Sequence, residues 1–249
     1  MKALFPISLS NQRFSTSLVI PAIEGLVEKY DEVLFLVADR LQVYNRAVSL
    51  GGRNLAEASG HKADFGVFRN ATRLTGTFEE RRRWLDKVKL RLGERAVGMK
   101  WSIESVDSIA DSKSFEILRN IDILNSVDPL FRQDILSSAV DFASRHPESL
   151  REVAVRLSTR YIIEELALSI RVRVHRKYYD EYYIGSTLLP AIRLYSGAYM
   201  ATPWDIAGVK RGAASFRFFE LARTHSEHPE WISVGMDSTE AEPFVRGHF

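Results

Sequence analysis

The sequence predicts a single α/β domain in which a mostly parallel sheet is flanked by helices. KALFPI at 2–7 has the composition of a short buried strand, and EVLFLVADR at 32–40 is a continuous apolar run typical of a strand buried on both faces. The stretch between them carries apolar residues at three- and four-residue steps, so the order is that of a βαβ unit. A length of 249 residues fits one domain, which we expect to span 1–249.

Each further element follows from a local pattern. Ser15 or Thr16 is expected to cap the helix between the two strands, and Pro21 lies in its first turns, where proline is best tolerated. Asp39 ends the second strand and leads into a helix, RLQVYNRAVSL, which is followed by GGRN at 51–54. The elements expected beyond this point are a basic helical region over 55–95, a strand over 97–105, an amphipathic helical section over 112–148, a long helix over 150–170, a strand-like alternation from 171 that ends at Gly185, and a short helix over 188–197. The last fifty residues show no clear period.

Composition excludes several classes of protein. Hydrophobic residues make up 45% and charged residues 27% of the chain, as in an ordinary globular protein. The absence of cysteine excludes disulfides, thiolate metal ligands and cysteine nucleophiles. No apolar run approaches the roughly 18 residues that span a bilayer, and no signal-peptide pattern opens the chain, so we expect a cytoplasmic protein with no membrane partner. The net charge of +2 requires that any binding of nucleic acid rely on local clustering.

Ser8 directly follows the first predicted strand. Ligands of open parallel sheets bind beyond the carboxyl ends of the strands, where a hydroxyl could attack a carbonyl and backbone N–H groups could hold the oxyanion. The alternative is that Ser8, Ser10 and Asn11 are loop residues that make turn and capping bonds. The sequence has no G-x-S-x-G elbow, and none of its six histidines is an obvious base, so a nucleophilic Ser8 would need a substrate that is already activated.

Tyr161 and Glu165 form a second candidate pair. At a spacing of four on a helix they lie one above the other, and a phenol beside a carboxylate can bind an ammonium group and pass a proton. Glu164 lies about 100° around the helix, where we expect it to be solvated or paired with Arg160 or Arg171. The alternative is an ordinary amphipathic helix on which the pair has no chemical role.

The helix expected near residue 85 is strongly basic. Its positive charge is predicted to spread around much of the helix, a distribution that favours a polyanion, although a solvated surface helix with internal ion pairs is the alternative. The cations of this tract are Arg81, Arg82, Arg83, Lys87, Lys89, Arg91 and Arg95.

Four segments in this order resemble the cyclodipeptide synthase family. FPISLSNQRFST is similar to the family's first strand and nucleophile loop, and EVLFLVADRLQVYNRA to its second strand and the continuation of that strand. RYIIEELAL is similar to its Y-x-x-x-E-L helix, and EYYIGSTLLP to its tyrosine strand end followed by G-x-x-LP. The order and rough spacing of these segments fit over residues 3–195, which is most of the chain.

This resemblance implies a Rossmann-type domain related to the catalytic domains of tyrosyl- and tryptophanyl-tRNA synthetases. It implies a monomer that uses two aminoacyl-tRNAs, without metal or cofactor, to make a cyclic dipeptide (a diketopiperazine) by a ping-pong route. Aminoacyl esters are already activated, which would explain a serine without a histidine. An alternative is a synthetase-like protein that binds aminoacyl-tRNA or transfers its aminoacyl group otherwise. A further alternative is a serine esterase with a base such as His175.

The family roles can be carried over residue by residue. Ser8 would hold the aminoacyl and dipeptidyl esters, Tyr161 and Glu165 the ammonium group, and Tyr183 would relay protons, with Tyr182 as its competitor. The remaining implied positions are Asn11 and Ile184 for substrate, and Arg81, Arg82, Arg83 and Lys87 for tRNA.

The chain also departs from the family pattern at three positions. Pro6 stands where glycine is common, Ile184 where proline or a polar residue is usual, and Ala167 where proline often follows E-L. These substitutions change the floor of the expected pocket and one of its polar contacts.

Overall fold

One sheet organises the part of the chain that the structure describes. This computed structural model describes residues 2–9, 15–24, 29–38, 41, 44, 78–106, 111–144, 151–175, 179–183, 189–209, 218–221 and 231–233. The strand order is β3-β2-β1-β4-β5-β6. The strands are β1 (Lys2–Ile7), β2 (Glu32–Val37), β3 (Lys100–Ser105), β4 (Tyr179–Tyr183), β5 (Phe218–Leu221) and β6 (Trp231–Ser233). All neighbours pair in parallel except β5 with β6, so the predicted mostly parallel α/β fold is confirmed.

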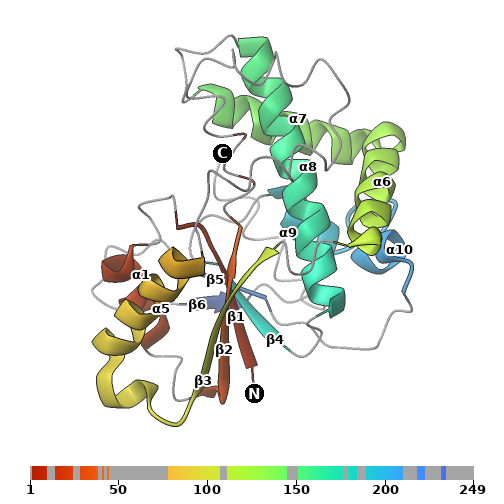
Figure 1. The fold of residues 1–249 in the computed structure, drawn as a ribbon. Coiled ribbons are helices and arrows are strands. Elements are labelled where there is room, and N and C mark those ends of the chain that lie inside the picture. Colours follow the sequence, from red (N-terminus) through yellow and green to blue (C-terminus); the bar gives the residue numbers. More distant parts are fainter. Residues whose placement is uncertain are drawn as a thin grey trace.

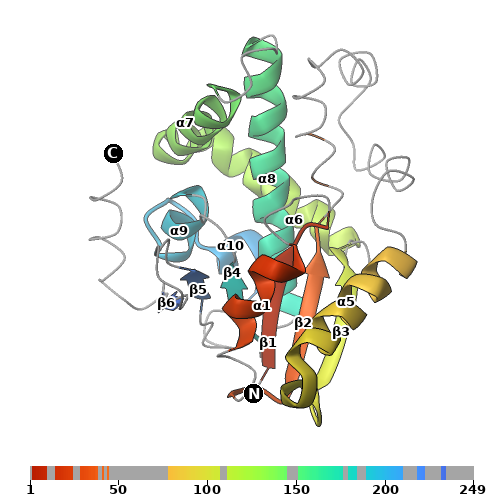
Figure 2. The same ribbon diagram turned by 90° about the vertical axis from the view of Figure 1, so that its left-hand side faces the viewer.

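Helices cover both faces of this sheet (Figures 1 and 2). The helices are α1 (Thr16–Glu24), α5 (Phe78–Leu92), α6 (Ser112–Val127), α7 (Pro129–Ser144), α8 (Arg151–His175), α9 (Leu189–Tyr195) and α10 (Pro203–Ala207). The 3₁₀ turn η4 (Gly93–Ala96) follows α5. Helices α1 and α5 lie on one face, and α6 and α8 on the other. No helix among the described residues is long and apolar enough to cross a membrane.

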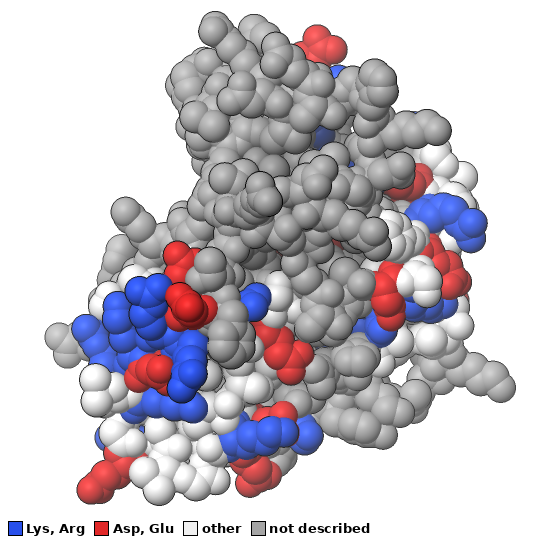
Figure 3. Space-filling model, in the orientation of Figure 1, with Lys and Arg blue, Asp and Glu red and all other residues white. Residues whose placement is uncertain are grey.

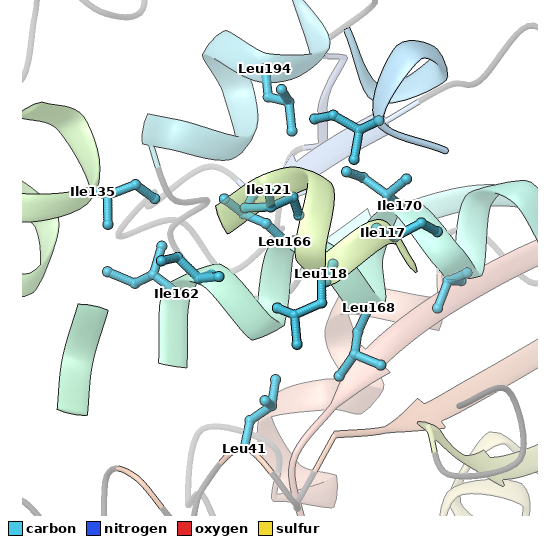
Figure 4. Packing of buried hydrophobic residues seen from close by; sticks show 14 of the residues in the cluster. Leu41, Ile117, Leu118, Ile121, Ile135, Ile162, Leu166, Leu168, Ile170 and Leu194 are labelled. Carbon is cyan, nitrogen blue, oxygen red and sulfur yellow. The ribbon is translucent and has the colours of Figure 1, made fainter. Parts of the chain in front are cut away.

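Alternation along the strands assigns each residue to one of two cores. Ala3 and Phe5 of β1 pack with α1 and α5, whereas Leu4 packs with the helices around α8. The same division holds in β2, where Phe35 belongs to the first core and Leu34 to the second. Figure 4 shows side chains of the second core meeting from α6, α7, α8 and α9. Because both faces of β1 and β2 are covered, these strands are apolar at consecutive positions, which is the signal that the sequence carried.

The predicted helical section over 112–148 is two helices that meet at Asp128. Pro129 is the first residue of α7, where its missing N–H costs no hydrogen bond. The Asp128 carboxylate accepts hydrogen bonds from the backbone N–H groups of Phe131 at 3.0 Å and Met200 at 2.8 Å. This buried side chain therefore caps α7 and attaches it to the segment after α9.

One predicted boundary is wrong. The valine alternation from residue 171 was expected to be a strand, but α8 continues to His175 and β4 begins at Tyr179. Val172 is buried in the core around α8, and the Arg173 guanidinium forms a buried ion pair with Glu181 at 2.8 Å. These contacts outweigh the weak preference of valine for strands. The predictions for 40–50 and 55–77 fall almost entirely outside the described residues.

Candidate active site

The strand order reverses between β1 and β4. From β1 the chain adds β2 and then β3 on one side, whereas β4 and β5 lie on the other side. In open α/β sheets a ligand crevice forms beyond the carboxyl ends of the strands at such a reversal. Ser8 directly follows β1, and Tyr183 is the last residue of β4, so two predicted site residues flank this point.

Ser8 lies on the α8 side of the sheet by strand parity. It continues the series of Leu4, which packs in the core around α8, and is itself 4% exposed. The carbonyl of Ile7 accepts a hydrogen bond from the N–H of Ala38 at 2.8 Å, so the segments that follow β1 and β2 are joined directly beside Ser8.

Pro6 limits the pairing of β1 with β4. The Ile7 carbonyl points toward β2, so position 6, of opposite parity, turns its backbone toward β4. Proline has no N–H to donate there. The paired positions between the two strands run from Lys2 with Tyr179 to Leu4 with Glu181, which stops short of Pro6. The departure from glycine noted in the sequence thus falls where the two strand ends stop pairing.

The predicted Tyr161–Glu165 pair forms on α8. The Tyr161 hydroxyl donates a hydrogen bond to Glu165 Oε1 at 3.3 Å. Burial raises the pKa of Glu165 from 4.5 to about 7, against the smaller opposing effect of the Tyr161 bond. A carboxyl with this pKa can exchange a proton near neutral pH, which is the property required of an acid–base group.

Of the two alternatives expected for Glu164, solvation or pairing with an arginine, the structure has the second. Glu164 is 1% exposed, and its Oε1 accepts hydrogen bonds from Tyr44 Oη at 2.9 Å and Arg160 Nε at 2.6 Å. Of the two partners expected for it, Arg160 is correct, whereas Arg171 instead pairs with an aspartate that precedes α6. Tyr44 is a residue that the sequence reasoning missed as part of this site, although it ends the quoted ADRLQVY segment.

The structure separates the two candidate tyrosines of β4. Tyr182 is buried in the core of α1 and α5, where its ring stacks on Phe5 at 5.2 Å and its hydroxyl lies 2.5 Å from that of Tyr30. Tyr182 is therefore a core residue on the face opposite α8. Position 183 has the parity of Glu181, which pairs with α8. The backbone of Tyr183 lies in β4, whereas its side chain, like Asn11 and Ile184, falls outside the described part.

The basic helix α5 has one buried and several exposed faces. Leu85, Val88 and Leu92 are buried in the core on the α1 face of the sheet, and the positive charge is spread around much of the rest of the helix, as predicted. Arg82 and Arg83 are exposed, and the other predicted tRNA contacts divide into half-buried Arg81 and exposed Lys87. Figure 3 shows the basic side chains of α5 gathered on one surface with acidic ones among them.

The described residues offer no evident metal site. Among them, histidine, aspartate and glutamate side chains do not form any group of three that could hold a metal ion. His175, the proposed base of an esterase, ends α8, and its side chain lies outside the described part.

Solved structures of other proteins share this architecture. A CDPS, or cyclodipeptide synthase, from Fluoribacter dumoffii matches with a TM-score of 0.57 and 18% identity, over 81% of this chain and 87% of that chain. A cyclodipeptide synthase from Bacillus thermoamylovorans matches with a TM-score of 0.54 and 14% identity, over 81% of this chain and 84% of that chain. The chain has the cyclodipeptide synthase fold. No protein-family model and no curated protein matches the sequence.

The cyclodipeptide synthase fold confirms at the level of architecture the resemblance seen in the four sequence segments. The segment FPISLSNQRFST contains the end of β1 and Ser8, and RYIIEELAL is the part of α8 that carries Tyr161 and Glu165. The segment EVLFLVADRLQVYNRA contains Tyr44. The roles of these residues remain predictions, to which the following experiments apply.

Glu165→Gln should change how stability depends on pH. The carboxyl of Glu165 has a higher pKa in the folded chain than its ordinary 4.5, so the folded state retains its proton longer than the unfolded state does. The tighter binding of this proton by the folded state stabilises the fold. This contribution to the free energy of unfolding is complete below about pH 4.5 and is lost as the pH rises toward 7. Relative to Glu165→Gln, the wild type should lose on the order of 2 kcal/mol of unfolding free energy between these limits, measured by urea unfolding.

The matched control for this measurement is Glu152→Gln, which changes an exposed glutamate at the start of the same helix. If both variants shifted the pH dependence equally, burial at Glu165 would not be the cause.

Proposed function

We propose that this chain is a cyclodipeptide synthase that takes aminoacyl groups from two aminoacyl-tRNAs and releases a cyclic dipeptide. The observation that carries the proposal is the juxtaposition of β1 and β4 at the reversal of strand order, with Ser8 after one strand and Tyr183 at the end of the other. The fold shared with cyclodipeptide synthases and the Tyr161–Glu165 pair on the adjoining helix support it.

The first step is acyl transfer to Ser8. Its Oγ attacks the ester carbonyl of one aminoacyl-tRNA, a new ester bond forms, and the bond to the tRNA ribose breaks. The proton of the serine hydroxyl leaves with the ribose oxygen. Glu165, ionised, and Tyr161 hold the ammonium group of the bound aminoacyl residue. Since one ester replaces another, the step needs no further activation.

Two amide bonds complete the product. The ammonium group of the aminoacyl residue on Ser8 first transfers a proton to Glu165. The resulting amine then attacks the ester of a second aminoacyl-tRNA and releases that tRNA. The free amine of the resulting dipeptide then attacks the ester on Ser8, which closes the ring and restores the serine hydroxyl. We assign proton relay in this last step to Tyr183. Both amide bonds form at the expense of esters, so the route balances without ATP.

The exposed cations of α5 would contact tRNA phosphates. This helix has six lysine and arginine residues and three acidic ones, so it carries a local excess of positive charge that the chain as a whole lacks. Such an excess gives binding that is independent of sequence and sensitive to salt.

The experiment that tests the function is expression in bacteria followed by mass spectrometry of the medium for cyclic dipeptides. Wild-type protein should yield a product, and Ser8→Ala should reduce its formation by more than about 1,000-fold because the acyl carrier is lost. Purified Glu165→Gln mixed with aminoacyl-tRNA should accumulate an aminoacyl ester on the Ser8 peptide. Salt-sensitive tRNA binding without product or ester would instead identify an aminoacyl-tRNA-binding protein.

Tyr183→Phe and Tyr182→Phe should separate chemistry from packing. Loss of a proton relay typically costs about 100- to 10,000-fold in rate, and we expect this loss for Tyr183→Phe. Tyr182→Phe keeps the stacked ring on Phe5 and removes the hydroxyl that bonds to Tyr30, so it should reduce stability and leave turnover nearly unchanged. The reverse result in a single-turnover cyclisation assay would transfer the relay to Tyr182.

Arg82→Ala should weaken tRNA binding in a salt-dependent manner. Each phosphate contact contributes about one unit to the slope of log affinity against log salt, so the slope should become shallower by about one. Arg119→Ala, which removes an exposed arginine from α6 on the other face of the sheet, is the control and should leave the slope unchanged. A slope unaltered by Arg82→Ala, Arg83→Ala and Lys87→Ala would remove α5 from the RNA-binding surface.

A further inference from the structure

Glu164 is a buried carboxylate beside the candidate catalytic pair that does not belong to it. Glu164 and Glu165 are adjacent in sequence, but their side chains leave the helix in directions about 100° apart. Glu164 bonds to Tyr44 and Arg160 through Oε1, and Arg160 reaches Asp122 of α6 at 3.3 Å. Its second oxygen, Oε2, is buried and makes no hydrogen bond within the described structure. A buried carboxylate is costly, so its retention here requires an explanation.

Tyr44, which bonds to this carboxylate, belongs to the segment after β2, and that segment also bonds to the strand that precedes Ser8. The N–H of Ala38 bonds to the carbonyl of Ile7, and the N–H of Leu41 bonds to the carbonyl of Ala38 at 3.2 Å. Leu41 packs among α6 and α8 residues in the core (Figure 4), and Tyr44 lies 7% exposed in the same core. The described residues of this segment thus bond to the end of β1 through Ala38 and to the middle of α8 through Tyr44.

A polar contact fixes a helix differently from an apolar one. Apolar side chains tolerate small sliding of a helix along a core, whereas a hydrogen bond to a carboxyl oxygen is directional and weakens with small displacements. Tyr161 and Glu165 flank Glu164 on the same rigid helix, so a displacement of α8 moves all three together. Misplacement of reacting groups by about 1 Å can reduce a rate about 100-fold.

We propose that Tyr44 and Glu164 are positioning residues, whose hydrogen bond sets the distance between Ser8 and the Tyr161–Glu165 pair. This inference rests on the proposed function, because it assigns the bond a role in the same reaction. Neither residue touches the reacting atoms. The structural role is to hold the part of α8 that lies beside the carboxyl edge of the sheet.

The test compares Tyr44→Phe with Tyr195→Phe in steady-state kinetics. Each variant removes one buried hydroxyl that bonds to α8, since Tyr195 Oη lies 3.1 Å from Ser169 Oγ. Tyr195 belongs to α9, whereas Tyr44 belongs to the segment after β2, which bonds to the carbonyl of Ile7 through Ala38. The substrates are the purified aminoacyl-tRNAs of the two amino acids found in the wild-type product. Tyr44→Phe should lower kcat by about 10- to 100-fold with KM within twofold, because tRNA binding lies elsewhere. Tyr195→Phe should leave both constants unchanged.

Glu164→Gln and Glu164→Ala provide a second, independent comparison. Glutamine retains an oxygen that accepts the Tyr44 bond, whereas alanine does not, so Glu164→Gln should recover at least tenfold of the kcat lost in Glu164→Ala. Thermal unfolding identifies any variant that does not fold, in which case the other pair decides.

The outcomes separate the two proposals. If the wild type forms product and both Tyr44→Phe and Tyr195→Phe have the same kcat as the wild type, the positioning role is overturned. The proposed function is then unaffected. A loss of kcat in Glu164→Gln as large as in Glu164→Ala would also overturn it. A folded wild-type protein that makes no cyclic dipeptide would overturn the proposed function and this inference with it.

Discussion

The parallel pairing of β1 with β4 is the contact on which the candidate site depends. It brings the ends of two strands that are far apart in sequence to neighbouring positions, and it creates the reversal of strand order at which open α/β sheets bind their ligands. The pairing is short because Pro6 has no N–H to extend it. A buried ion pair between Arg173 and Glu181 then attaches α8 to β4. Without these contacts, Ser8 and Tyr183 would have no reason to lie near the same helix.

Under the proposed function, helix α8 supplies both the chemistry and the framework of the site. Its C-terminal half lies beside the sheet and its N-terminal half extends beyond the carboxyl ends of the strands (Figures 1 and 2). Burial raises the pKa of both Glu164 and Glu165 to about 7. Among the described residues, Glu164 has a cationic and a phenolic donor, whereas Glu165 has a phenolic donor. Two adjacent carboxyls thus have similar pKa values in different surroundings. The one held by Arg160 suits a structural role, and the one beside Tyr161 suits proton exchange.

The sheet separates the predicted RNA-binding helix from the predicted chemistry. Helix α5 packs on the face of Phe35, and α8 packs on the face of Leu34. Under the proposed function, a tRNA held by Arg82 and Arg83 must therefore direct its aminoacylated end around the carboxyl edge of the sheet to reach Ser8. In this arrangement, selection among aminoacyl-tRNAs depends on contacts at the strand ends. The phosphate contacts on α5 contribute affinity without selecting a sequence.

Local patterns in the sequence were sufficient for the strands β1 and β2, for the helix that carries Tyr161 and Glu165, and for the side-by-side arrangement of those two residues. These features depend on periodicity and on spacing within one element, which the order of residues contains. Contacts between distant segments decided the rest. The continuation of α8 to His175 depends on a pair between Arg173 and β4, the burial of Glu164 depends on Tyr44, and the assignment of Tyr182 to the opposite core depends on Tyr30. Such partners are determined by packing in three dimensions. They are far apart along the chain, so no periodic pattern in the sequence predicts them.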